Sequence, residues 1–454
     1  MNKARIIASA LFLICTLSIL VHPSFHAVAQ NQSLATGISF SWTAPSNISE
    51  SNMIGFTAEV DRGLCVDSQE NVHIVYHGST NAFNSNTFEI FYANNANGSW
   101  NTPYRLTTND VADIHSTIAA DHQGNIHIAY RGSDSNDLEI MYINKTLSGW
   151  SIPENISKDD YDDGVVSIAV DNNGYVHIAW QGNDGEDNEI YYSNNLGGFW
   201  SPPVNLTQNE QNEDYPSIIV DPQNVVHVVW EGHDGSPNRD MEIFYTNSIG
   251  GSWAIQNVTE NELDNIKPSI GLDNESNVHL SYMERNTSSY EFGVFYVARN
   301  NGIWGTPVRI SAITGIALHT SLAVDGEGGI HVAYSQVDLE GYVSFPADYE
   351  IFYTSNAAGF WGTPINITQN DLGDYRPCIF VDGLNYAHIV YHVLPTAYFP
   401  LDPNIIYIKS TDPVVVLGGG GTHVLLLIGV SFAGVAAAAA VALWLLRKRE
   451  VPFP

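Results

Sequence analysis

The sequence predicts an all-β protein: a seven-bladed β-propeller that is closed by its own N-terminal strand and followed by one C-terminal transmembrane helix. Three observations predict this fold. One short marker recurs seven times, each repeat contains short strand patterns separated by turn residues, and the last repeat lacks a strand pattern that stands alone before the first. Repeated four-stranded units of this size are typical of propellers.

The marker is an aspartate followed six residues later by a histidine, and it returns every 50 to 57 residues. The seven pairs are Asp67 and His73, Asp121 and His127, Asp171 and His177, Asp221 and His227, Asp273 and His279, Asp325 and His331, and Asp382 and His388. We interpret these residues as structural, because groups repeated once per blade point to seven places, whereas metal ligands must converge on one ion. The aspartate is expected to accept hydrogen bonds from its own turn.

The third repeat shows the expected unit most clearly. Ser167–Val170, Tyr175–Trp180, Glu189–Ser193 and Trp200–Thr207 are short runs rich in β-branched and aromatic residues, separated by Gly, Asn and Asp. Such runs are typical of antiparallel strands joined by tight turns.

The two ends of the repeat array predict how the ring closes. The last repeat has three strand patterns and no fourth, whereas Trp42–Ser49 stands before the first repeat and matches the fourth strand at Trp361–Thr368. We therefore expect the N-terminal strand to complete the last sheet, since closure hides sheet edges that would otherwise pair with other chains.

The chain ends predict export and anchoring. Residues 1–29 have the charged start, apolar run and A-x-A site of a signal peptide, an N-terminal membrane anchor being the alternative. The propeller is expected over 38–412, a linker over 413–422, a transmembrane helix over 423–446 and a basic cytoplasmic tail over 447–454. A sorting signal that is later cleaved is the alternative for this last segment. The prediction is a single-pass protein of the cell membrane with its N-terminal part outside.

Composition limits the partners. The net charge of −32 disfavours nucleic acid and favours cations, with plain solubility as the alternative explanation. N-x-S/T sequons such as Asn97 and Asn205 make glycosylation a prediction for an exported chain. Cys65 and Cys378 lie on strands expected to be neighbours in the ring, where they are either a disulfide or two buried thiols.

The turns between third and fourth strands carry a family resemblance. Ser193, Asn195, Gly197 and Trp200 fit an S-x-D-x-G-x-x-W pattern with Asn in place of Asp, and Thr246–Trp253 fits it with Thr246, Ser248, Gly250 and Trp253. This pattern resembles the Asp-box (BNR) repeat of the sialidase-like propeller superfamily. The resemblance implies the fold more firmly than an activity, because the box is structural in that family.

The resemblance also implies what a catalytic member would need: three arginines, a Tyr/Glu pair and an acidic residue. Arg376 is the one catalytic candidate, because it alone stands where the family has its first-strand arginine. Sialidases are six-bladed and no Tyr/Glu pair can be picked out, so the sequence indicates a non-catalytic member.

Calcium is the one cofactor that the sequence suggests. The loops expected on one face of the propeller are acidic, and carboxylates on loops suit this hard cation. The candidate ligands are Asp160, Asp162, Asp163, Asp184 and Asp187, although no EF-hand spacing is present.

The sequence therefore favours a cell-surface binding or adhesion protein for glycans or proteins over an enzyme. The alternatives are a sialidase-like carbohydrate-active enzyme, either glycosidase or lyase, and a structural component of the cell envelope.

Overall fold

The computed structural model describes residues 41–49, 54–57, 62–79, 88–134, 136–236, 240–286, 291–337, 348–394 and 404–414. Within these ranges the regular structure is β-strand, apart from two 3-10 turns at Leu196–Gly198 and Ile249–Gly251. The fold is therefore all-β, as predicted.

Each repeat supplies a set of antiparallel strands. The first two repeats contain β2 (Ile54–Thr57), β3 (Leu64–Val66), β4 (Val72–Ser79), β5 (Glu89–Asn94), β6 (Tyr104–Arg105), β7 (Ile114–Ala120), β8 (Ile126–Ser133), β9 (Leu138–Thr146), β10 (Gly149–Trp150) and β11 (Glu154–Asn155). The third and fourth contain β12 (Asp163–Val170), β13 (Val176–Asn183), β14 (Asn188–Asn194), β15 (Val204–Asn205), β16 (Glu213–Val220), β17 (Val226–His233), β18 (Met241–Asn247) and β19 (Gln256–Asn257). The last three contain β20 (Asp264–Leu272), β21 (Val278–Asn286), β22 (Glu291–Asn300), β23 (Ile303–Trp304), β24 (Val308–Arg309), β25 (Ile316–Val324), β26 (Ile330–Val337), β27 (Glu350–Ser355), β28 (Ile365–Asn366), β29 (Gly373–Val381), β30 (Ala387–Leu394), β31 (Asn404–Lys409) and β1 (Ser46–Asn47).

The number of sheets corrects the prediction of seven separate blades. The described strands form six hydrogen-bonded sheets, one of which has nine strands. The strands of the fifth and sixth repeats share this large sheet because Phe292 of β22 pairs in parallel with Ile316 of β25. A repeat in sequence is therefore not always a separate sheet in this protein.

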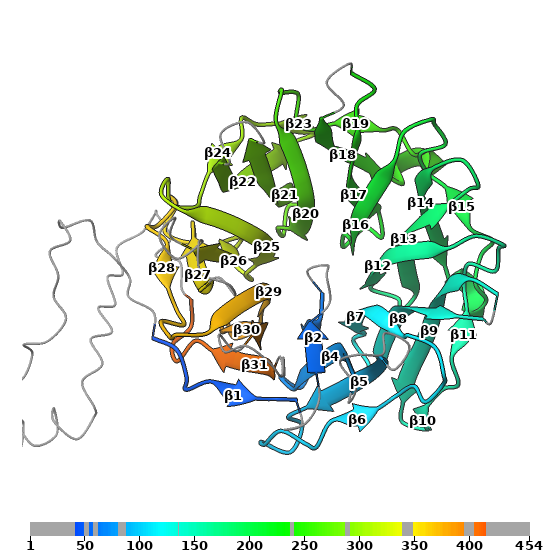
Figure 1. Cartoon of the computed structure of the whole chain (residues 1–454), viewed down its shortest axis with the longest axis horizontal. Coiled ribbons are helices and arrows are strands. Elements are labelled where there is room, and N and C mark those ends of the chain that lie inside the picture. Colours follow the sequence, from blue (N-terminus) through cyan, green and yellow to red (C-terminus); the bar gives the residue numbers. More distant parts are fainter. Residues whose placement is uncertain are drawn as a thin grey trace, which may run out of the picture. The chain divides into compact units, whose positions relative to one another are not determined.

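The N-terminal strand closes the array, as its sequence predicted. Ser46 and Asn47 of β1 pair with Tyr407 and Ile406 of β31, so the sheet that contains β29, β30 and β31 gains its outer strand from the other end of the chain (Figure 1). The first strands of the repeats also contact one another in the order β3, β7, β12, β16, β20, β25, β29 and back to β3. These strands therefore surround a central axis.

Aromatic pairs join each sheet to its neighbour. The Asp-box tryptophans pack against tyrosines of the adjacent repeat, with ring centroids 4.9 to 5.3 Å apart. Trp42, which lies outside the seven Asp/His repeats, packs in the same way on Tyr353 at 5.3 Å. The N-terminal segment therefore supplies both the missing strand and the missing tryptophan, and the apolar core lies between sheets rather than within them.

The repeated aspartates and histidines stabilise each repeat through hydrogen bonds made within it. In the third repeat the Oδ1 atom of Asp171 accepts hydrogen bonds from the backbone N–H groups of Asn173 and Tyr175, both at 2.8 Å. His177 Nδ1 lies 2.7 Å from the hydroxyl of Tyr192, and Nε2 lies 3.7 Å from Asp171. In the seventh repeat the corresponding Nε2 of His388 lies within hydrogen-bond distance of Asp382, at 2.9 Å; because a carboxylate only accepts, we assign the ring proton there to Nε2 and the Tyr407 hydroxyl as the donor to Nδ1. Burial lowers the pKa of His177.

The prediction of a membrane anchor needs correction, whereas the two alternatives for the cysteines are decided by the structure. None of the helical segments in the described ranges has the length and apolar character that a membrane crossing requires. The predicted signal peptide (1–29), span (423–446), tail (447–454) and most of the linker lie outside these ranges. The part of the chain that the structure describes does not support the predicted membrane anchor, the membrane as a partner or the single-pass location. Cys65 and Cys378 are two free, buried thiols rather than a disulfide.

Candidate functional site

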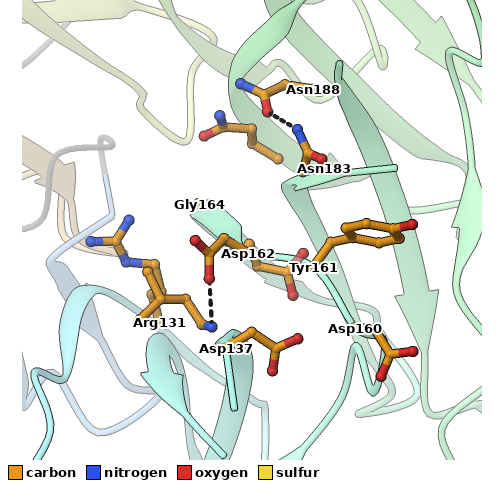
Figure 2. Close-up of a pocket in the computed structure, with 11 residues that line it drawn as sticks. Arg131, Asp137, Asp160, Tyr161, Asp162, Gly164, Asn183 and Asn188 are labelled. Atoms are coloured by element: carbon orange, nitrogen blue, oxygen red, sulfur yellow. Dashed lines mark hydrogen bonds between the residues drawn. The ribbon is translucent and has the colours of Figure 1, made fainter. Parts of the chain in front are cut away.

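The predicted calcium ligands fall into two groups. Asp160, Asp162 and Asp163 line a pocket of about 510 Å³ beside β12, together with Arg131 and Asp137 (Figure 2). Asp162 is oriented there by the backbone N–H of Leu138, which donates to its Oδ1 atom at 3.0 Å.

The other two predicted ligands, Asp184 and Asp187, belong to a different cluster. Their nearest carboxylate partner is Glu189, and the three ligand atoms lie within 4.8 Å of one another. The structure therefore does not bring the five predicted aspartates to one point.

Arg376, the predicted catalytic candidate, sits in a β-bulge on the innermost strand β29. Its backbone has a positive φ of 50°, and its N–H donates to Ser335 Oγ of the preceding repeat at 3.1 Å. The corresponding bulges of other repeats hold His115, Tyr215, Lys267 and His319, all with positive φ. A left-handed backbone is unfavourable for such residues, and bulges commonly re-aim side chains near active sites.

A second set of variable residues occupies one register position on the second strand of every repeat, directly after the buried Tyr or Trp. This set, which we call the axial column, consists of His77, Arg131, Gln181, Glu231, Met283, Ser335 and His392. The residue before this position is Tyr or Trp in all seven repeats, whereas the column itself varies in charge and size.

The axial column and the bulge residues meet. The rings of His77 and His115 lie 6.3 Å apart, and Ile114, next to His115, pairs directly with Arg131. His77 and His115 therefore lie side by side between the first and second repeats, and Arg131 lies on the strand that pairs beside His115; we call these three residues the axial cluster.

Across the ring the same two columns make further contacts. Tyr375 stacks on His392 with centroids 5.6 Å apart, and the Lys267 ammonium lies 4.4 Å from the centre of the Tyr215 ring. Glu231 accepts a hydrogen bond from the backbone N–H of Lys267, and burial raises the pKa of Glu231 to about 8. The protein thus places basic and titratable groups on the first and second strands of its repeats while its overall charge is strongly negative.

Sequence reasoning missed the axial cluster. The available signal was the variable position that follows the repeated Tyr or Trp, as in Tyr76-His77-Gly78 and Tyr130-Arg131-Gly132. Reading that position required knowing that the second strands of different repeats surround one axis, which is a property of the ring.

Pairs of carboxylates lie between neighbouring repeats just outside this centre. Burial, with repulsion from Glu350, raises the pKa of Asp374 to about 7, and burial with repulsion from Glu189 raises that of Glu213 to about 8. At the corresponding place Asn265 replaces the second carboxylate and donates to Glu242 Oε2 at 3.0 Å. Each of these interfaces therefore requires either one proton on the pair of carboxylates or an amide in place of one of them.

We expect Asp374→Asn to flatten the dependence of stability on pH. A folded pKa raised from 3.8 to about 7 favours the protonated form, so its stabilisation is complete below about pH 4 and is lost as the pH rises through 7. The free energy involved is about 4 kcal/mol at most. Thermal melts from about pH 5 to about pH 9 should show a smaller fall for Asp374→Asn than for the wild type. The exposed control Asp110→Asn should follow the wild type, and equal falls in all three proteins would contradict the shared-proton account.

The fold defines the class of protein: this chain folds as a β-propeller, the fold that the resemblance of the Asp-box turns implied. No family model matches the chain, and no curated protein matches it either.

Several solved structures are similar to this chain in fold. A polysaccharide lyase of the PL25 family, an ulvan lyase bound to -[GlcA(1-4)Rha3S]-, has a TM-score of 0.58 at 11% identity over 79% of this chain and 94% of that chain. The polysaccharide lyase Uly1 has a TM-score of 0.52 at 9% identity over 84% and 93%. The microbial sialidase Hz136 is more distant, with a TM-score of 0.42 at 12% identity over 71% and 73%.

Proposed function

We propose that this chain binds an anionic, uronate-containing polysaccharide at the axial cluster and cleaves it by β-elimination. The observation that carries the proposal is the pair of His77 and His115, whose rings lie 6.3 Å apart across two neighbouring repeats, with Arg131 on the strand that pairs beside His115. The likeness in fold to two polysaccharide lyases supports the same class of substrate.

The chemistry of β-elimination matches these side chains. A uronate is activated when a cation neutralises its carboxylate, which a guanidinium does well because it binds carboxylates through two parallel hydrogen bonds. A base then removes the C5 proton, the C4–O bond breaks, a C4=C5 double bond forms, and an acid protonates the departing oxygen. Histidine suits both proton transfers near neutral pH. We assign the carboxylate to Arg131 and the proton transfers to His77 and His115.

The charge distribution supports an anionic ligand. A chain with a net charge of −32 repels polyanions over most of its surface, so binding requires a local concentration of basic groups. Arg131, Lys267 and Arg376 all lie in the axial column or at the bulges of the innermost strands. This arrangement favours a polyanion bound at the centre of the ring.

The test is an assay of the full chain with a polymer of glucuronate and rhamnose 3-sulfate. Cleavage by elimination creates a double bond conjugated to the carboxylate, so ultraviolet absorbance should rise while viscosity falls. A neutral glucan is the matched control and should give neither change. Binding of the anionic polymer without a rise in absorbance would refute the lyase step and leave a glycan-binding protein, the role that the sequence first favoured. Absence of both binding and cleavage would refute the proposal altogether.

A further inference from the structure

One of the repeated glutamates at the start of the third strands differs from the others in the hydrogen bonds that its carboxylate accepts. Each is buried or half-buried and faces a Ser or Thr, and in most repeats its second oxygen also has a hydrogen-bond partner. In the third repeat Asn209 N–H donates to Glu189 Oε1 at 2.7 Å, and in the fourth Asn261 N–H donates to Glu242 Oε1 at 2.8 Å. The sixth repeat is the same, with Asn370 N–H 2.8 Å from Glu350 Oε1.

Glu139 breaks this pattern. Its side chain is fully buried, at 0% exposed, yet Oε1 has no hydrogen-bond partner. Ser157 and the backbone N–H of Lys158 both donate to the other oxygen, Oε2, the latter at 3.0 Å. The position occupied by Asn209 in the third repeat holds Asp159 here, which adds a negative charge where a neutral amide stands elsewhere.

An unsatisfied buried carboxylate oxygen is costly unless a cation or water meets it. Asp134 and Asp137 lie beside Glu139, and one oxygen from each of the three residues falls within 4.8 Å of the others. Asp137 Oδ1 is also buried without a hydrogen-bond partner. Asp137 and Glu139 therefore each carry a buried oxygen without a donor, and both residues belong to this cluster.

The separation of these oxygens fits calcium. Ca²⁺ holds oxygen ligands at about 2.3 to 2.6 Å, so two ligands on opposite sides of the ion are about 4.6 to 5.2 Å apart. A cluster confined to 4.8 Å can therefore share one ion. Asp137 also lines the pocket of about 510 Å³ that contains Asp160 and Asp162, so water can supply the remaining ligands and further carboxylates strengthen the local field (Figure 2).

We propose that Asp134, Asp137 and Glu139 bind one calcium ion at the edge of this pocket. The site differs from the one that the sequence suggested, because Asp184 and Asp187 surround a glutamate whose two oxygens already accept hydrogen bonds from Thr207 and Asn209. The ion would also hold the turn between β8 and β9, and β8 carries Arg131 of the axial cluster.

Calorimetric titration of the EDTA-treated full chain with CaCl₂ tests the proposal, independently of any activity. We expect one saturable site and a melting temperature that rises with Ca²⁺. Asp134→Asn and Asp137→Asn should each weaken binding at least about tenfold, since each removes a charged oxygen ligand. Asp134 is exposed, so its variant should fold even if Glu139→Gln does not.

Asp184→Asn is the matched control, because it makes the same change in the neighbouring cluster, and it should bind calcium like the wild type. Absence of heat and of a melting shift in the wild type would overturn the proposal. Unchanged affinity in both Asp134→Asn and Asp137→Asn would overturn it as well.

Discussion

Removing residues 41–49 is expected to unfold the propeller as a whole. This segment supplies β1, and Ile48 is only 4% exposed within a core cluster that joins the first and last repeats. Trp42 packs on Tyr353 of the sixth repeat. Truncating a buried Ile costs about 2–5 kcal/mol and a packed Trp about 3–5 kcal/mol, against a typical domain stability of about 5–15 kcal/mol.

Point variants distinguish the loss of ring closure from a non-specific loss of stability. Ile48→Ala and Trp42→Ala should each lower the midpoint of denaturant unfolding, and together they should abolish the cooperative transition. Ile152→Ala is the control, because Ile152 is 86% exposed and its loss should change the midpoint little. A chain lacking residues 41–49 that unfolds cooperatively near the wild-type midpoint would show that the ring does not depend on this strand.

Replacing the histidines of the axial cluster is expected to remove cleavage while preserving the fold. A positioned general acid or base contributes about 10²- to 10⁴-fold to a rate, so His77→Ala and His115→Ala should each lower kcat by that order. Arg131→Ala should raise KM as well as lower kcat, because Arg131 is assigned to the substrate carboxylate. Arg131→Lys should recover part of the loss, since the charge remains but the two parallel hydrogen bonds do not.

His122→Ala is the control for these variants. His122 is exposed and lies after the opposite end of β7 from His115, where its Nε2 atom is 3.1 Å from Asn172 Oδ1. It should leave kcat, KM and the melting temperature unchanged. Full activity in both His77→Ala and His115→Ala would contradict the assignment, whereas activity lost together with the melting transition would point to folding instead.

The sequence predicted much of the fold because the repeat has strong local signals. Turn residues such as Asp171 and Gly174 and the alternating strands beside them are set by near neighbours in the chain. The N-terminal strand was also predictable, because Trp42–Ser49 matches the outer strands of other repeats. The predicted number of sheets was wrong, because the pairing of Phe292 with Ile316 depends on how strands β22 and β25 of two repeats meet in space.

The candidate site was predicted less well. Acidic loops directed attention to Asp160, Asp162, Asp163, Asp184 and Asp187, because charge is visible in a sequence. The unsatisfied oxygen of Glu139 is visible only once every hydrogen bond around it is known. Arg376 was singled out alone, although it is one of five comparable bulge residues.

By itself the sequence determined the all-β class, the strand-turn unit and the completion of the last sheet by β1, since these follow from local propensity and from matching segments. The tertiary structure alone decided which residues meet at the axis. His77 and His115 are 38 positions apart and belong to different repeats, and their rings come within 6.3 Å because the innermost strands surround one axis. Local patterns encode strands, whereas proximity across repeats arises from the closed ring.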